Sequence, residues 1–129
     1  MTACCAVIDA DGHLSFAGAG HPPLFIRRRD GVVEALPSLN TVMGIDQKMV
    51  ALESNATLDS GDVALLYTDG LFGLKSNAGE RFTDETVADV FSRIDGTADL
   101  LPRLIAQLVQ RSDAQAFDDD VAAIVLRRA

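Results

Sequence analysis

The sequence predicts an α+β fold in which mostly antiparallel strands form a sandwich and two helices cover one sheet. Short apolar runs that end in turn-forming residues recur through the first half of the chain and again at its end, as expected of strands. Two longer segments between them carry apolar residues on one helical face. With 129 residues, of which 48% are hydrophobic and 23% charged, the chain is expected to form a single domain over residues 1–129.

The first half of the chain is predicted to consist of paired strands. Its first segment is apolar on both faces, which favours a central strand. Asp11-Gly12 and Asp30-Gly31 each separate two strand-like runs, and Asp-Gly in that position is a strong hairpin signal. A later segment alternates only partly and is expected to be a half-exposed strand. The predicted strands are residues 2–8, 13–17, 24–28, 32–36 and 49–58.

Residues 63–67, Val-Ala-Leu-Leu-Tyr, are predicted to form a buried strand because they are continuously apolar or aromatic and then meet Thr68-Asp69-Gly70. The carboxylate of Asp69 is therefore expected at the end of a core strand, where a packed scaffold can hold a functional acid rigidly. Asp62, before the strand, is interpreted as a turn or strand-start residue rather than a ligand.

Two helices are predicted after this strand, over about residues 83–94 and 99–111. In the first, Thr83 can cap the helix, and two acids follow it near the positive end of the helix dipole. In the second, Pro102 falls in the first turn, where proline is tolerated. Each helix has one apolar stripe, formed by Val87, Val90, Phe91 and Ile94 in the first and by Leu101, Leu104, Ile105, Leu108 and Val109 in the second.

The chain closes with Asp118-Asp119-Asp120 followed by the apolar run 121–126, which is predicted to be the last strand. This order is the reverse of the order at Asp69, where the strand precedes the acid. If the two strands are antiparallel neighbours, Asp69 lies beside Asp118–Asp120. Like charges gathered from distant parts of a chain usually bind a hard divalent cation. The pattern alone leaves open whether these acids form such a site or a solvated acidic turn.

Composition limits the possible partners and compartment. The net charge of −8 argues against binding to nucleic acid or to an anionic membrane. No segment approaches the ~20 apolar residues of a membrane span, and no basic region precedes an apolar one at the start of the chain. Cys4 and Cys5 are adjacent and are expected to be buried structural thiols, which suits the reducing cytoplasm.

Four motifs resemble the metal-dependent PPM-type serine/threonine phosphatases, in the bacterial branch typified by the stage II sporulation phosphatase and the stress-response regulatory phosphatases (SpoIIE/RsbU-like). They occur in family order, and the resemblance covers essentially the whole chain. It implies a partial αββα sandwich, the C-terminal portion of the family domain. The motifs are Ala19-Gly20-His21-Pro22-Pro23, Met43-Gly44-Ile45, Tyr67-Thr68-Asp69-Gly70 and Asp119-Asp120 with the last strand.

The resemblance implies two Mn²⁺ or Mg²⁺ ions at one end of the sheets, which activate a water for attack on a phosphoserine or phosphothreonine. Asp69 and Asp119 correspond to metal ligands, and Gly70 brings the backbone close to the metals. Asp120 is an outer or alternative ligand, and Asp118 is an extra acid without a clear counterpart.

His21 also matches a family loop, where loop structure is favoured over chemistry. By family analogy, the substrate is a phosphorylated signalling protein such as an anti-sigma factor antagonist.

Departures from the family pattern bear on activity. The upstream Asp-x-x-Gly-His-Gly-type metal motif is absent, Gly73 stands where the branch often has an acid, and Ala122 replaces a frequent Thr. We therefore expect at most one weak metal site and a phosphatase domain that is inactive as this chain, or else a non-catalytic pseudophosphatase that binds a protein partner. An uncovered sheet face also predicts a homodimer.

Overall fold

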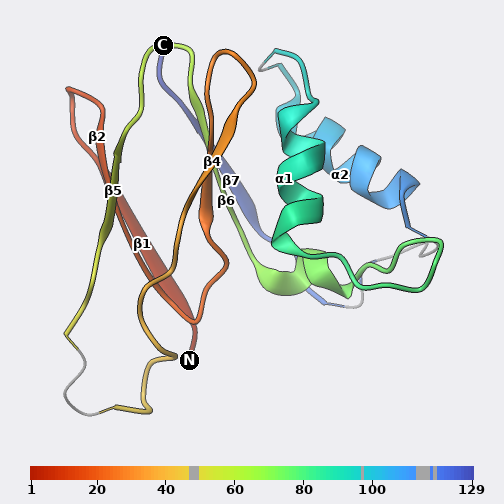
Figure 1. Ribbon diagram of the computed structural model, residues 1–129, viewed down its shortest axis with the longest axis horizontal. Coiled ribbons are helices and arrows are strands. Elements are labelled where there is room, and N and C mark those ends of the chain that lie inside the picture. The colour runs from red at the N-terminus through yellow and green to blue at the C-terminus, as the bar shows by residue number, and fades with distance from the viewer. Residues whose placement is uncertain (47–49, 97, 113–116, 118) are drawn as a thin grey trace.

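Three layers make up the fold of the computed structural model, which describes residues 1–46, 50–96, 98–112, 117 and 119–129 (Figure 1). Within these residues, seven strands form two sheets, and two α-helices pack against one of the sheets. The α+β class and the placement of both helices on a single sheet are therefore confirmed. None of the described helices has the length and apolar composition needed to cross a membrane.

The two sheets are antiparallel throughout. The three-stranded sheet has the order β1-β2-β5, and the four-stranded sheet has the order β4-β3-β6-β7. Every pair of neighbouring strands runs antiparallel. The strands are β1 (Ala3–Ile8), β2 (His13–Ala19), β3 (Leu24–Arg27), β4 (Val33–Leu36), β5 (Ser54–Thr57), β6 (Val63–Tyr67) and β7 (Ala123–Arg127).

The helices α1 (Asp84–Ser92) and α2 (Leu100–Gln110) fall inside their predicted ranges. Thr83 is the residue that caps α1, and its own backbone N–H donates to Thr86 Oγ1 at 3.3 Å. A short 3₁₀ helix, η1 (Asp69–Gly73), follows β6 directly and was not predicted from the sequence. It turns the chain out of the sheet toward α1 (Figure 1).

Two hydrophobic cores hold the layers together, one on each face of the four-stranded sheet. Successive residues of a strand point to opposite faces, so the apolar strand β6 contributes to both. The core between the sheets is built from Leu14, Phe16, Leu24, Ile26, Leu36, Leu58 and Ala64. The core under the helices includes Phe25, Leu65, Tyr67, Leu71, Leu74, Phe82, Val87, Phe91, Leu104 and Leu108.

The strand β1 lies at a sheet edge, so its prediction as a central strand is wrong. Cys4 and Ala6 pack against the core between the sheets, whereas Val7 is 61% exposed and Cys5 is also exposed. The expectation of two buried thiols is therefore wrong, since Cys5 is exposed and Cys4 is only half-buried. Apolar residues on both faces indicate a central strand only when both faces are covered, and the described elements leave the outer face of this sheet open (Figure 1).

The half-exposed strand predicted over residues 49–58 is shorter than expected, because only Ser54–Thr57 pair with β2. Residues 47–49 lie outside the described part of the chain.

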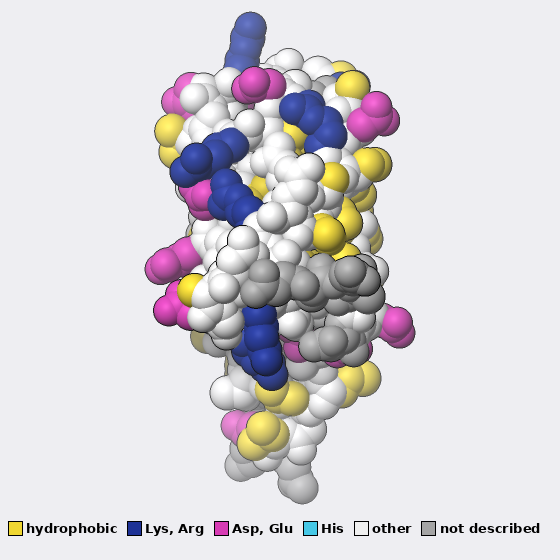
Figure 2. All heavy atoms as spheres, turned by 90° about the vertical axis from the view of Figure 1, so that its right-hand side faces the viewer, with side chains coloured by type: hydrophobic (Ala, Val, Ile, Leu, Met, Phe, Trp, Pro, Cys, Tyr) yellow, Lys and Arg dark blue, Asp and Glu magenta, His cyan; other side chains and the backbone are white. Residues whose placement is uncertain are grey.

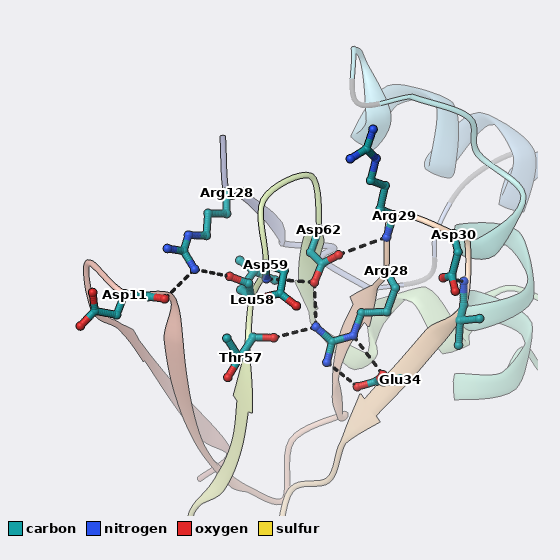
Figure 3. Close-up of polar contacts among 11 residues, drawn as sticks. Asp11, Arg28, Arg29, Asp30, Glu34, Thr57, Leu58, Asp59, Asp62 and Arg128 are labelled. Carbon is teal, nitrogen blue, oxygen red and sulfur yellow. Dashed lines mark hydrogen bonds and ion pairs between the residues drawn. The ribbon is translucent and has the colours of Figure 1, made fainter.

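Asp62 is the centre of a charged cluster at the start of β6 (Figure 3). It is only 3% exposed, and its Oδ2 accepts hydrogen bonds from Arg28 Nη1 at 2.7 Å and from the backbone N–H of Asp59 at 3.0 Å. Its Oδ1 accepts the N–H of Arg29 at 3.1 Å. The guanidinium of Arg28 also makes two hydrogen bonds to Glu34, at 2.6 and 3.0 Å, which hold the pKa of Glu34 below its usual range.

This cluster joins the β3–β4 and β5–β6 turns at the end of β6 that is opposite to Asp69. Asp62 ends the turn directly before β6, as interpreted from the sequence, but it also neutralises Arg28 and satisfies two backbone donors. Because a buried carboxylate without partners is costly, these contacts fix the mutual position of the two turns.

The Asp62→Asn substitution is expected to lower the free energy of unfolding by about 2 kcal/mol, because it leaves a partly buried Arg28 without its buried carboxylate partner. Glu34→Gln removes the other partner of Arg28, whose side chain is 51% exposed, and is expected to cost less than about 1 kcal/mol. Urea denaturation of both variants and the wild type measures the difference. Equal losses in the two variants would contradict the central role of Asp62.

Candidate metal centre

The end of β6 and the approach to β7 are joined by Thr68. Its backbone N–H donates to the carbonyl of Ala122 at 2.9 Å, and its Oγ1 accepts the N–H of Ala122 at 3.0 Å. The same hydroxyl donates to the carbonyl of Asp120 at 3.4 Å. These bonds continue the β6–β7 ladder, whose last pair is Tyr67 with Ala123. The two acid-flanked strands, β6 and β7, are therefore antiparallel neighbours, as expected from the sequence.

Asp69 and Asp119 line a single pocket of about 320 Å³ together with Phe72, Gly73 and Arg81. Asp69 is the first residue of η1, and Asp119 precedes the start of β7. Both acids are exposed, and Asp119 Oδ1 accepts the backbone N–H of Asp120 at 2.8 Å. The pocket thus brings together two carboxylates that are distant in the sequence.

Gly70 is buried against the segment that carries Asp119. A Cβ atom at this position would overlap the carbonyl oxygen of Asp120 and lie 2.9 Å from its carbonyl carbon. It would also lie 3.3 Å from Val121 Cγ2. The missing side chain therefore lets the backbone of residue 120 approach η1 closely, next to both acids.

The other predicted site residues are placed differently. Asp120 is exposed and contacts Thr68 through its backbone carbonyl. Asp118 lies outside the described residues. His21 lines another pocket, between α1 and the β3–β4 hairpin, and its ring contacts Pro22 and Cys4. Its Nδ1 donates to the carbonyl of Pro22 at 2.9 Å, which leaves Nε2 to accept the thiol of Cys4 at 3.4 Å.

Sequence reasoning missed several residues that shape the pocket. Phe72 and Arg81 line it, although neither belongs to a recognisable motif. Tyr67 stacks on Phe25 with the ring centroids 5.6 Å apart and meets Phe72 edge to face at 6.1 Å. Its hydroxyl donates to Asp84 Oδ1 at 2.7 Å, while burial raises the pKa of the phenol. These contacts hold η1 between β6 and the start of α1.

The donor set can be compared with the needs of a hard divalent cation. Mg²⁺ and Mn²⁺ favour six oxygen ligands, and protein sites often supply only one or two carboxylates with water in the remaining positions. Asp69 and Asp119 meet that minimum. Among the described residues, no group of three or more His, Cys, Asp or Glu side chains could hold a metal ion. The described residues therefore offer two carboxylates to a divalent cation, fewer than the six oxygen ligands that it favours.

Comparison with known proteins gives consistent results. The whole chain, residues 1–129, matches the family described as Stage II sporulation protein E (SpoIIE). Protein IcfG of Synechocystis sp. is 26% identical over 124 residues, which are 95% of this chain and 20% of that protein.

Solved structures share the fold at lower sequence identity. The PP2C phosphatase domain of SpoIIE from Bacillus subtilis, solved with a fragment of its regulatory domain, gives a TM-score of 0.81 at 22% identity, covering 98% of this chain and 37% of that one. The RsbU and RsbW domains of a Mycobacterium tuberculosis protein give 0.80 at 24% identity, covering 99% and 36%. The Mn-presoaked SpoIIE phosphatase domain gives 0.75 at 22%, covering 99% and 56%. The chain thus spans only part of each of these relatives.

The Gly70→Ala substitution is expected to push the backbone of residue 120 away from η1 and to lower the free energy of unfolding by about 1–3 kcal/mol. It should also weaken Mn²⁺ binding, since the two acids move apart. Gly79→Ala is the control, because a Cβ there meets no atom within 4 Å, although its φ of +82° adds strain. Thermal unfolding and Mn²⁺ titration of both variants test this, and normal Mn²⁺ affinity in Gly70→Ala would contradict it.

Proposed function

The chain belongs to the SpoIIE family of PP2C-type phosphatase domains, and we propose that it forms part of a metal-dependent site for the hydrolysis of phosphoserine or phosphothreonine on a signalling protein. One observation carries this proposal: Asp69 and Asp119, at the end of β6 and before β7, face the same pocket. The family match supplies the reaction class, and the pocket supplies a place for it in this chain.

In the proposed site, Asp69 and Asp119 hold Mn²⁺ or Mg²⁺, and Asp120 lies beside them as an outer or alternative ligand. Gly70 keeps the two ligand-bearing segments close together. A bound ion supplies Lewis-acid activation of water and offsets the charge of the phosphoryl group. That charge compensation matters here, because a chain with a net charge of −8 otherwise repels a phosphorylated partner.

The small donor set leads us to propose that this chain alone binds at most one ion weakly and has negligible phosphatase activity. A second candidate function is a non-catalytic binding module of the pseudophosphatase type. It is favoured by Gly73, which lines the pocket at a position where a carboxylate could have supplied a further ligand. The two functions differ in whether a longer protein that carries this domain hydrolyses its bound phosphoprotein.

The proposed partner is a phosphorylated signalling protein, for example an anti-sigma factor antagonist, in the cytoplasm. We do not propose nucleic acid as a partner. Figure 2 shows the face formed by the helices, where basic side chains are scattered among acidic ones and do not form a continuous basic stripe. A group of hydrophobic side chains lies on the same face (Figure 2).

We further propose a homodimer formed through the outer face of the three-stranded sheet. Val7 pairs with Ser15, and Cys5 pairs with Ala17, so these four side chains share that face. They are small or apolar, and Val7 is 61% exposed. An uncovered sheet face of this composition favours association with a second copy.

Metal binding is expected to depend on both carboxylates. Asp69→Asn and Asp119→Asn should each lower the affinity for Mn²⁺ by at least about tenfold, because each removes a charged ligand. Asp11→Asn, at the tip of the β1–β2 hairpin, is the matched control and should bind as the wild type does. Isothermal titration calorimetry or Mn²⁺ electron paramagnetic resonance measures the affinity. Unchanged binding in Asp69→Asn would remove the basis of the proposal.

Hydrolysis of a phosphoserine peptide by the Mn²⁺-loaded chain is expected to stay at the rate seen without protein. Release of inorganic phosphate measures it. Robust Mn²⁺-dependent release that Asp69→Asn abolishes would show that two carboxylates suffice and would overturn the view of an incomplete site.

The dimer is expected to dissociate in the Val7→Asp variant, since a charge then occupies the proposed apolar contact. Val32→Asp serves as the control, because Val32 is 54% exposed but lies in the β3–β4 turn. Analytical ultracentrifugation across a concentration series measures the association. A wild-type chain that remains monomeric at high concentration would refute the proposed dimer.

A further inference from the structure

A short hairpin, residues 74–82, extends from η1 beside the pocket of Asp69 and Asp119. The N–H of Phe82 donates to the carbonyl of Leu74 at 3.0 Å, and the N–H of Ser76 donates to the carbonyl of Glu80 at 2.7 Å. Lys75 and Arg81 are the bridged pair between these two bonds. They are therefore a non-hydrogen-bonded pair, the arrangement in which opposite side chains of antiparallel strands come closest.

Alternation along the hairpin directs the two cations away from the core. Leu74 is 0% exposed and Phe82 is 4% exposed, so both point into the core under the helices. Lys75 and Arg81 alternate with them, and both are exposed on the opposite side.

Two like charges placed directly opposite each other destabilise a hairpin. Within the described part of the chain, neither cation has a carboxylate within 4.0 Å, since the ion pairs found there involve Arg28, Arg93 and Arg111. The hairpin thus places two positive charges side by side, and neither forms an ion pair with a carboxylate among those residues. An external anion would relieve their repulsion.

The position of Arg81 indicates which anion fits. Its side chain lines the pocket that Asp69 and Asp119 also line, so the pocket has carboxylates and a guanidinium on its walls. The planar guanidinium matches two oxygens of a phosphate group, and such charge-assisted pairs are among the stronger hydrogen bonds. A phosphoryl group in this pocket would therefore lie near the guanidinium and near the two acids, which would hold a divalent cation.

We propose that Arg81, supported by Lys75, is the phosphate-binding residue of this site and holds the phosphoryl group of a phosphoserine substrate. This inference rests on the proposed function, because it takes the substrate class from it. Arg81 binds the substrate in this scheme and takes no part in holding the metal. The competing interpretation is that Arg81 only balances the negative charge of Asp69 and Asp119.

The two interpretations predict different responses to Arg81→Gln. If Arg81 binds the substrate, its loss weakens phosphate binding. The loss also removes a positive charge near a bound Mg²⁺, so the affinity for Mg²⁺ should stay the same or rise by about twofold. Loss of a merely charge-balancing residue leaves phosphopeptide binding unchanged. Two binding measurements on one variant therefore separate the interpretations without an activity assay.

The experiment is a nuclear magnetic resonance titration of the ¹⁵N-labelled chain with Mg²⁺, and then with a peptide carrying one phosphoserine. The same peptide with unmodified serine is the ligand control. Arg81→Gln is expected to weaken phosphopeptide binding about tenfold and Lys75→Gln about threefold, whereas Arg81→Lys should recover part of the loss. Arg29→Gln, which removes a cation beyond β3 at the other end of the four-stranded sheet, should bind as the wild type does.

The outcomes separate this inference from the proposed function. If Mg²⁺ binds and Arg81→Gln leaves phosphopeptide affinity unchanged, the phosphate-binding role fails and the metal site stands. If Mg²⁺ does not bind the wild type, the proposed function fails, and Arg81-dependent binding of the phosphopeptide in metal-free buffer would still support the anion site. Equal affinity for the serine and phosphoserine peptides, or no binding of either at millimolar concentration, would overturn the inference.

Discussion

The antiparallel ladder between β6 and β7 is the constraint on which the arrangement of this domain depends. Its register runs from Val63 opposite Arg127 to Tyr67 opposite Ala123. A slip by one residue would exchange the faces of β7, since side chains alternate along a strand. Residues of β6 and β7 fill both cores, so such a slip would expose apolar groups on two sides at once. The cores therefore fix which residues meet beyond the ends of the ladder.

The same ladder separates two groups of acids that have opposite environments. At the start of β6, Asp62 is buried and satisfied by Arg28 and by two backbone N–H groups. Beyond the other end, Asp69 is exposed in a pocket that also contains Asp119. Both acids border the same apolar strand, yet one stabilises turns and the other is available to a ligand. Their neighbours determine this difference, and residue type alone does not.

Periodicity and motif order predicted the parts of the fold that local patterns specify. The apolar run of β6 and the stripes of both helices are strong patterns, and two acid-flanked strands that run antiparallel necessarily bring Asp69 and Asp119 to one end. The edge position of β1 depends on which strands pair with it, and the exposure of its outer face depends on which elements cover the sheet. No local pattern contains either. The burial of Asp62 depends on Arg28, from another turn. The position of Arg81 depends on a 3₁₀ helix held by Tyr67 and Phe72. It therefore could not be predicted without the tertiary structure.

The rest of the domain places few structural constraints on the tip of the hairpin that carries Lys75 and Arg81. Leu74 and Phe82 attach its base to the core, whereas residues 77–80 are exposed and a side chain at Gly79 would meet open space. Insertions, deletions and charge changes at the tip therefore leave the β6–β7 ladder undisturbed. The sequence of the tip can therefore change in length and charge over evolution while the positions of Asp69 and Asp119 stay the same.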